Sequence, residues 1–353
     1  MSSVWGRNIK ISLFGESHGT AVGMSMSGLP AGFELDPEMI RAEMNRRSPG
    51  QNELTSARKE SDSFEIISGM FRGRTTGSPL CILIRNEDAE SSAYVQGMIR
   101  PSHADLSAYF KYGGYSDFRG GGHFSARLTA PLVFAGAAAK QVLEKEKIRI
   151  GARIKSIGSV SDADAGAEEI ISASKKAFPV LSARAEEEMK KEILSAGNSR
   201  DSVGGIIECA AAGIKPGLGE PFFDSLESSI ASMMFSVPAV KAVEFGAGFA
   251  LSGMRGSIAN DQLSTDGENI IYHSNNGGGI EGGISNGQPV VFRAGIKPAA
   301  SIGTVQSSVD IINMQTVMTA SEGRHDPCPA LRAVPVIEAG TALCLLDFLH
   351  DRF

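Results

Sequence analysis

The sequence predicts an α+β fold in a single domain that spans residues 1–353. Segments with the hydrophobic period of strands and segments with that of helices follow one another without the regular alternation of a doubly wound parallel sheet. No Pro/Ser-rich linker divides the chain. With 353 residues, of which 42% are hydrophobic and 21% charged, the chain has the composition of a globular protein that buries a large core.

Four segments have the pattern expected of strands. In the first, Ile9, Ile11 and Leu13 alternate with polar residues, which is typical of a strand with one buried face. The segment that follows, residues 14–19, is expected to be a turn that presents polar side chains at the strand end. The other predicted strands cover residues 80–84, 148–154 and 289–294.

Four further segments are predicted to be helices, at residues 129–147, 185–195, 225–237 and 335–350. The second has an exposed face, because it carries two Glu–Lys pairs at i,i+4 spacing. The third has an apolar stripe that we expect in the core, formed by Leu226, Ile230, Met233 and Val237. The polar segment 162–191 is expected to be an excursion on the surface.

Charge and composition exclude several classes of protein. The formal net charge of −6 argues against non-specific nucleic-acid binding, so any anion site must be a local cluster of cations. Residues 1–10 lack the apolar core of a signal peptide, and the apolar run 130–139 is too short to span a bilayer. We therefore expect a cytoplasmic protein without a membrane partner.

The four cysteines agree with a reducing compartment, because they lie far apart and form no Cys-x-x-Cys pair. Cys81 and Cys344 lie in apolar runs. We expect buried thiols there rather than a disulfide or a metal site.

Chemistry is concentrated around four of the six histidines, His18, His103, His123 and His325. Each lies in a loop-like segment with Gly, Pro or Ser and a nearby charged residue. A histidine can exchange a proton near neutral pH, so four in similar surroundings indicate an active site. A separate pair, Arg46 and Arg47, precedes a turn and suits bidentate binding of phosphate or carboxylate.

Two of these segments combine charge with unusual backbone freedom. In Arg100-Pro-Ser-His103-Ala-Asp105, the proline stiffens a loop that carries a fixed cation and a titratable imidazole, which Asp105 can orient. In the other, Gly120, Gly121 and Gly122 come shortly before the helix predicted from residue 129. Backbone N–H groups and a helix dipole at such a place can hold phosphate.

Other common sites are excluded. The chain has no P-loop, no Gly-x-Gly-x-x-Gly after a strand and no Gly-x-Ser-x-Gly. Zinc binding by His325, Asp326 and Cys328 is the competing hypothesis for that segment. No partner pair has metal-ligand spacing and the neighbouring arginines would repel a cation, so we expect no metal.

Nine motifs, in this order, resemble those of the chorismate synthase family across essentially the whole chain. They are FGESHG at 14–19, RRSPGQ at 46–51, SGMFRGRTTGSP at 68–79, RPSHAD at 100–105, RGGGHFSARLTA at 119–130, GLGEPFFD at 217–224, GGISNGQ at 282–288, KPAASI at 297–302 and GRHDPCPALRAVPV at 323–336. The resemblance implies a β-α-β sandwich in which antiparallel sheets enclose helices, and it implies a homotetramer.

The resemblance also implies a reaction. Members of this family are carbon–oxygen lyases of the shikimate pathway to the aromatic amino acids. They convert 5-enolpyruvylshikimate 3-phosphate to chorismate by a 1,4-anti elimination of phosphate. The family requires reduced FMN, although the reaction has no net redox change. No segment resembles a flavin reductase, so we expect an external NAD(P)H-dependent reductase to supply reduced FMN. The alternative hypothesis is a catalytically silent FMN-binding paralogue.

Roles follow from the matching positions. His103 is similar to the acid beside the departing phosphate, His18 to the proton donor to reduced flavin with Ser17 beside it, and Asp326 to the carboxylate near flavin N5. The positions similar to substrate-binding ones are Arg46, Arg47, Arg100 and Arg127, and the region of Arg47 is also associated with NADP. The positions similar to flavin-binding ones are His123, Phe124, Ser125, Pro238, Ala239, Gly282, Lys297, Pro298, Ala299, Ala300, Ser301 and Arg324.

The chain departs from the family pattern at several of these positions. Ser102 replaces a glycine, and if that residue has φ > 0 the change costs ~1–2 kcal/mol. His123 replaces an arginine, which exchanges a fixed charge for one mostly lost above pH ~6.5. Further departures are Glu53, Phe124, Leu128 and Ala299. These departures bear on flavin affinity and on its pH dependence.

Overall fold

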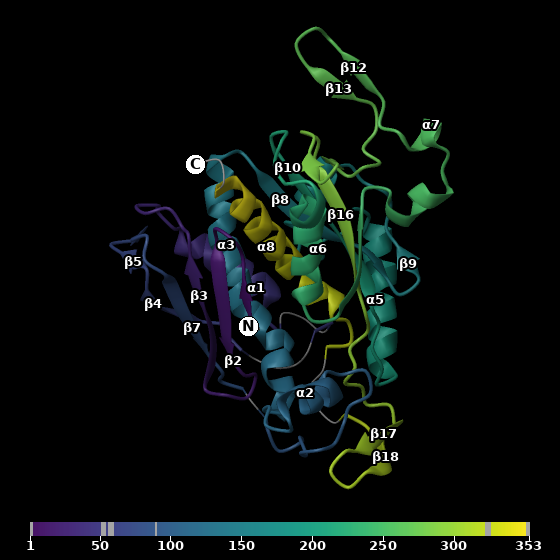
Figure 1. The fold of residues 1–353 in the computed structure, drawn as a ribbon. Helices are drawn as coiled ribbons and strands as arrows, with labels where there is room; N and C mark the ends of the chain where they lie inside the picture. The colour runs from purple at the N-terminus through teal and green to yellow at the C-terminus, as the bar shows by residue number, and fades with distance from the viewer. Residues whose placement is uncertain (1–2, 51–53, 56–59, 89, 322–325, 351–353) are drawn as a thin grey trace.

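Two five-stranded antiparallel sheets enclose a layer of helices (Figure 1). The computed structural model describes residues 3–50, 54–55, 60–88, 90–321 and 326–350. The first sheet has the order β1-β2-β3-β7-β4, with β1 Val4–Trp5, β2 Lys10–Gly15, β3 Ala21–Ser27, β4 Phe64–Ser68 and β7 Leu80–Arg85. The second has the order β11-β16-β10-β8-β9, with β8 Arg149–Ile157, β9 Val160–Ser161, β10 Gly205–Ala212, β11 Val240–Phe245 and β16 Val290–Ile296.

The helix layer packs closely. Its members are α1 Pro37–Arg47, α3 Thr129–Lys145, α6 Leu226–Ser236 and α8 Ala330–Leu349. The helix α3 contacts β3 and β7 of the first sheet, whereas α8 contacts β8 and β10 of the second. A Cβ at Gly136 of α3 would lie 2.2 Å from the Cβ of Ala339 in α8, so only glycine permits this approach of the two helices.

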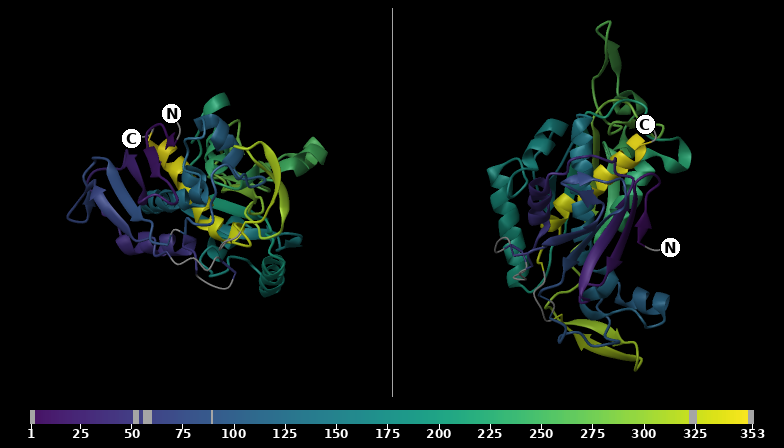
Figure 2. Two further views of the ribbon diagram at one scale, coloured as in Figure 1. Left: turned by 90° about the horizontal axis from the view of Figure 1, so that it is seen from below. Right: turned by 90° about the vertical axis from the view of Figure 1, so that its left-hand side faces the viewer.

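Smaller elements complete the chain. The β12–β13 hairpin (Leu263–Thr265, Ile270–Tyr272) and the β17–β18 hairpin (Gln306–Asp310, Gln315–Thr319) project from opposite ends of the molecule (Figures 1 and 2). The remaining described strands are β5 Met70–Phe71, β6 Arg74–Thr75, β14 Ile280–Glu281 and β15 Ile284–Ser285. The remaining α-helices of the described residues are α2 Asp105–Tyr112, α4 Ala167–Ala173, α5 Ala183–Asn198 and α7 Gly256–Ala259.

The α+β class and each of the eight predicted elements are confirmed, with shifted ends. The apolar stripe of α6 is buried, and the two Glu–Lys pairs of α5 have N–O distances of 2.5 and 2.6 Å. The last helix begins at Ala330 rather than at Pro335, which lies inside α8. Burial of nearly the whole helix between the sheets outweighs the hydrogen bond that this proline removes.

Two other expectations are wrong in part. Segment 162–191 is not simply a surface excursion, because α4 packs against β8 and β10 through the buried Ile170 and Ile171. Cys344 is buried as expected, but Cys81 is only half-buried. It lies in β7 between the buried Leu80 and Ile82, and its side chain therefore points to the opposite, less covered face. Among the helices of the described residues, none has the length and apolarity needed to cross a membrane.

Candidate active site

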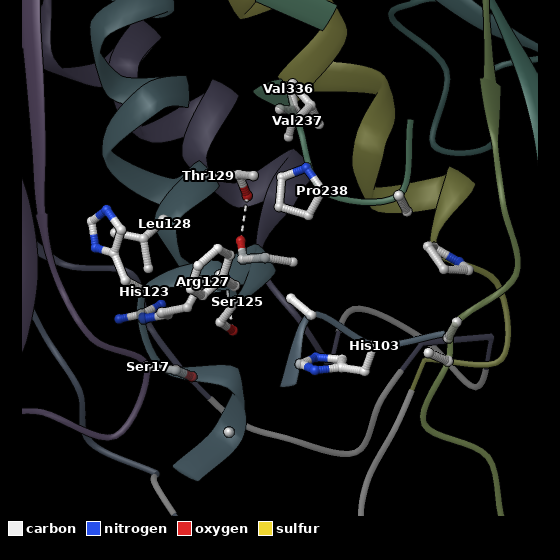
Figure 3. A pocket seen from close by; sticks show the side chains of 18 of the residues that line it. Ser17, His103, His123, Ser125, Arg127, Leu128, Thr129, Val237, Pro238 and Val336 are labelled. Carbon is white, nitrogen blue, oxygen red and sulfur yellow. Dashed lines mark hydrogen bonds between the residues drawn. The ribbon is translucent and has the colours of Figure 1, made fainter. Parts of the chain in front are cut away.

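A cleft of about 1400 Å³ opens at one end of the helix layer (Figure 3). The first turns of α3 and α8 line it, together with the last turn of α6 and the start of β11. Neither α3 nor α8 has a side-chain cap at its N-terminus. Among the described lining residues are seven lysines and arginines but only four carboxylates. A chain with a net charge of −6 thus has a cationic cleft, as expected of a site for anions.

Most of the predicted site residues lie together in this cleft. The lining includes Ser17, His18, Arg47, Arg100, His103, His123, Phe124, Ser125, Arg127, Pro238, Ala239, Lys297, Pro298, Ala299, Ala300, Ser301 and Asp326. Arg46 and Gly282 are not among the lining residues. Arg324 lies outside the described residues, as do His325 and Glu53.

The three glycines make room for the two central histidines. Gly120, Gly121 and Gly122 all have left-handed backbone, with φ of 58°, 83° and 53°. A Cβ at Gly120 would lie 2.3 Å from Nε2 of His18, and a Cβ at Gly121 would lie 3.2 Å from Nε2 of His103. The loop therefore packs its backbone against both imidazoles, which a larger residue would displace.

His103 is held from behind by charged neighbours. Its Nδ1 lies 2.6 Å from Oδ1 of Asp105 and 3.1 Å from Nη2 of Arg100. Arg100 donates to Asp105 from its backbone N–H, Nε and Nη2, and from Nη1 to Oγ of Ser301. Burial disfavours the Asp105 anion, but hydrogen bonds from His103 and Arg100 hold its pKa well below the usual range.

His18 and Ser17 form the opposite wall. Nδ1 of His18 lies 2.9 Å from Oγ of Ser91, and the ring meets Tyr94 edge-on at 5.2 Å between centroids. The backbone N–H of Ser17 donates to the carbonyl of Gly122 at 3.1 Å. Oγ of Ser17 is buried and has no hydrogen-bond partner among the described residues. A buried hydroxyl without a partner at the edge of a cleft is suited to a ligand.

An arginine cluster lies around one buried carboxylate. Asp62 accepts hydrogen bonds from Nε of Arg47 at 3.1 Å and from Oγ of Ser48 at 2.6 Å, and it also pairs with Arg127. Burial opposes ionisation of Asp62, yet Arg47 and Arg127 lower its pKa to about 2.

The same cluster leaves Arg47 in a poor environment for a cation. Burial lowers the pKa of Arg47 to about 10; Asp62 opposes this shift, while the charges of Arg332 and Arg127 add to it. Arg332 in turn pairs with Asp326 at 2.5 Å and donates to the carbonyl of Arg47 at 2.8 Å. An anion bound here would relieve repulsion among the three arginines.

The segments that resemble flavin-binding ones form another wall. Ala239 has φ of 74°, and its carbonyl accepts the N–H of Lys297 at 2.9 Å. Nζ of Lys297 donates to the carbonyl of Ser102 at 2.7 Å. Ser102 has φ of 59°, so the left-handed conformation considered for this position is present.

His123 takes the place expected for an arginine, and both of its ring nitrogens have hydrogen-bond partners in the chain. Its Nδ1 lies 2.8 Å from the carbonyl of Gly15, and its Nε2 lies 2.5 Å from Oγ of Ser3. Since a carbonyl only accepts, Nδ1 carries a proton and Nε2 can accept from the hydroxyl. The ring joins the start of the chain to the glycine-rich loop.

Arg46 lies behind the cleft instead of in it. Its guanidinium pairs with Glu338 at 2.7 Å and with Glu43 at 2.9 Å, and it donates to the carbonyl of Ser174. Lys140 completes this group by pairing with both carboxylates. Gly282, which also lies outside the cleft, is in the turn that joins β14 and β15.

Several residues that line the cleft or hold its lining in place could not be identified from the sequence. Asp62 and Glu60 lie in a polar stretch with no motif. They contribute to the site only through long-range ion pairs, Asp62 with Arg47 and Arg127 and Glu60 with Arg127. Tyr94 and Ser91 were likewise missed. Arg332 could have been predicted to lie near the site, because it follows Asp326 and Cys328 by only six and four residues.

Comparisons with known proteins agree on one family. The family model described as chorismate synthase matches residues 9–350. The chain is 44% identical over 349 residues to a chorismate synthase of Thermococcus kodakarensis, covering 98% of this chain and 97% of that protein. It is 41% identical over 352 residues to one of Dehalococcoides mccartyi, with 98% and 96% coverage.

A solved structure has the same fold. The crystal structure described as chorismate synthase superimposes with a TM-score of 0.79 at 31% sequence identity. The match covers 99% of this chain and 93% of that one. The sandwich of two antiparallel sheets around helices is therefore the fold of that protein as well.

Proposed function

This chain belongs to the chorismate synthase family, and we propose that its cleft eliminates phosphate from 5-enolpyruvylshikimate 3-phosphate to give chorismate. One observation supports this most: His18, His103, Arg47, Arg127 and Asp326, which come from distant parts of the chain, line one cationic cleft. Such a set of fixed cations and titratable groups suits a phosphorylated substrate that gives up a proton and a phosphate.

Arginines are the groups that would hold the substrate. Arg100, Arg127 and Arg47 line the cleft, and each charge-assisted hydrogen bond to phosphate or carboxylate is worth ~1.5–3 kcal/mol. Arg100 and Arg127 are each fixed by carboxylates, so their guanidinium groups are oriented before the substrate binds. Arg46 is not part of this proposal, because its bonds are directed to Glu338 and Glu43.

The cleft also fits a flavin. Ser17 offers a buried hydroxyl without a partner among the described residues, and the glycine-rich loop brings its backbone against both histidines without a side chain in between. We infer that His123, Phe124, Ser125, Pro238, Ala239 and residues 297–301 would hold FMN, with Arg324 from outside the described residues. When bound, reduced FMN supplies the transient electron donation that weakens the C–O bond. An external NAD(P)H-dependent reductase would keep it reduced.

Three groups of the chain would handle protons. As an imidazolium, with a proton on each ring nitrogen, His103 would donate the Nε2 proton to the departing phosphate and be left as the Nδ1–H tautomer bonded to Asp105. His18, whose Nε2 lies against the backbone of Gly120, would hold the proton for the reduced flavin. Asp326, oriented by Arg332, assists removal of the ring proton.

We also propose a homotetramer in the cytoplasm. Large apolar side chains that are more than four-fifths exposed support an assembly, among them Phe222, Phe223 and Phe249. Light scattering after gel filtration tests this: a mass near four times that of the chain supports it, and a monomer at micromolar concentration contradicts it.

The deciding experiment is anaerobic phosphate release from 5-enolpyruvylshikimate 3-phosphate, with reduced FMN, oxidised FMN and no flavin in parallel. The proposal expects stoichiometric phosphate and chorismate only with reduced FMN. Flavin binding without phosphate release would instead support the catalytically silent paralogue. That hypothesis is based on the departures from the family pattern at Ser102, His123 and Leu128.

A further inference from the structure

We propose that Asp105 is a positioning residue for the elimination: its carboxylate holds His103 in the tautomer that keeps Nε2 toward the cleft. This inference rests on the acid role of His103 under the proposed function. Asp105 is the first residue of α2, and it does not itself line the cleft, whereas His103 does. Asp105 would therefore act through His103 without touching the substrate.

The hydrogen bonds around Nδ1 of His103 determine which atom carries the proton. Oδ1 of Asp105 lies 2.6 Å from this nitrogen, and Nη2 of Arg100 lies 3.1 Å from it. A guanidinium only donates and an ionised carboxylate only accepts, so the two neighbours favour opposite tautomers.

The carboxylate prevails for a geometric reason. Nη2 of Arg100 has a second acceptor, Oδ1 of Asp105, at the shorter distance of 2.8 Å, and Nε of Arg100 donates to Oδ2 at 2.8 Å. Nε and Nη2 of Arg100 thus both have Asp105 as an acceptor, and together with His103 they hold that carboxylate ionised. Nδ1 of His103 then donates to Asp105 both before and after proton transfer: the imidazolium gives up its Nε2 proton to the cleft and returns to the Nδ1–H tautomer.

The surroundings of Nε2 agree with this assignment. The backbone of Gly121 packs beside it, and an added Cβ there would lie 3.2 Å from Nε2. Gly121 has φ of 83°, and any side chain at this position would crowd Nε2. A His103 with its proton on Nε2 and none on Nδ1 would lose the bond to the half-buried Asp105.

A merely structural role is the competing explanation. Asp105 is an acidic residue in the first turn of α2, where it gains from the helix dipole, and it ties the loop of Arg100 to that helix. A structural role predicts that Asp105→Asn weakens the enzyme whether or not His103 is present. A role through His103 predicts that the effect vanishes when His103 is absent.

The test is therefore a double-mutant cycle with Asp105→Asn, His103→Ala and the double variant. We expect Asp105→Asn alone to lower kcat on the order of 10²–10⁴-fold. In the His103→Ala background we expect less than about a threefold further loss, because interacting residues are not additive. Equal losses in both backgrounds would overturn the proposal. Asp266→Asn is the matched control, since Asp266 accepts backbone N–H groups in the remote β12–β13 turn.

A second measurement separates this inference from the proposed function. Two-bond ¹H–¹⁵N spectra of histidine-labelled protein, with His103→Ala used for assignment, report the tautomer without any turnover. We expect the Nδ1–H form of neutral His103 in the unsubstituted protein and a shift toward Nε2–H in Asp105→Asn. An unchanged tautomer in Asp105→Asn contradicts the positioning role. Full turnover by His103→Ala would instead remove the acid role while these spectra still decide the tautomer.

Discussion

Arg46 and Arg47 are neighbours in α1, yet they serve opposite sides of the molecule. Burial disfavours the Arg46 cation, but Glu338 and Glu43 more than offset this and raise its pKa. Burial instead lowers the pKa of Arg47 to about 10, and Arg332 and Arg127 add to the shift. Arg46 is satisfied by two carboxylates behind the cleft, whereas Arg47 lines the cleft and shares one carboxylate, Asp62, with Arg127.

The difference follows from helix geometry. Successive residues of an α-helix point about 100° apart, so a pair of adjacent arginines cannot share one environment. The sequence motif around residues 46–51 therefore contains one residue for the fold and one for the site. The carboxylates Glu338 and Glu43 match the charge of Arg46 and stabilise the native packing, whereas Arg47 and Arg127 share Asp62 and can still attract an anion into the cleft.

The largest expected effect concerns the ion-pair group behind the cleft, which consists of Arg46, Lys140, Glu43 and Glu338. Glu338→Ala removes the carboxylate that Arg46 and Lys140 share and leaves two buried cations with reduced compensation. We expect the free energy of unfolding to fall by about 3–5 kcal/mol, measured by urea denaturation. The control is Glu168→Ala, which breaks an exposed pair with Arg149 and should cost less than about 1 kcal/mol. Equal losses would refute the distinction.

The same group makes stability depend on pH. Burial opposes ionisation of Glu338, but Lys140 and Arg46 lower its pKa from 4.5 to about 2. A lowered pKa in the folded state stabilises it above the unfolded value, and this contribution is lost as pH falls from about 4.5 to about 2. By linkage it amounts to about 3 kcal/mol. Glu338→Gln should flatten the fall in unfolding free energy over this window, and an unchanged slope would contradict this.

Matched substitutions of the two arginines directly test whether Arg47 binds the substrate while Arg46 only stabilises the fold. Arg47→Met removes a cation of the cleft and should weaken substrate binding about 10–100-fold in calorimetric titrations. Arg46→Met should leave the affinity of the folded protein within about twofold, while it lowers the free energy of unfolding. Equal weakening by both substitutions would show that Arg46 also belongs to the site.

The smallest expected effect concerns Ser102, which has φ of 59° beside His103. Ser102→Gly relieves this conformation, worth ~1–2 kcal/mol, but increases the entropy of the unfolded chain. We expect a net gain of about 0.5–1 kcal/mol by thermal unfolding. Ala104→Gly, at φ of −72°, should destabilise instead. A loss of stability in both variants would contradict the account of Ser102.

Periodicity was sufficient for the long elements and insufficient for the short or atypical ones. Strands such as β2 and helices such as α3 have strong apolar patterns and were predicted to within a few residues. The helix α1 was missed because it is largely polar, although Asp36 as its cap and Pro37 at its start are recognisable signals. The strand β3 was missed because glycine and serine interrupt its apolar residues.

The site was predictable where short motifs contain it and unpredictable where distant segments meet. The loops of His18, His103 and His123 could be identified from local sequence, and they do lie in one cleft. The pairing of Arg47 and Arg127 with Asp62 depends on the packing of the first sheet against α3, which no local pattern reports. For the same reason, the adjacency of Arg46 and Arg47 could not show that Arg46 pairs with Glu43 and Glu338 while Arg47 lines the cleft.

The central claim is that the cleft, and His103 in it, carries the chemistry. The most direct measurement is the rate of anaerobic phosphate release by His103→Ala with reduced FMN, with His273→Ala as a control at an exposed position outside the cleft. The account predicts a loss in kcat of about 10²–10⁴-fold for His103→Ala, with an unchanged unfolding midpoint, and a normal rate for His273→Ala. Near-normal phosphate release by His103→Ala would contradict it.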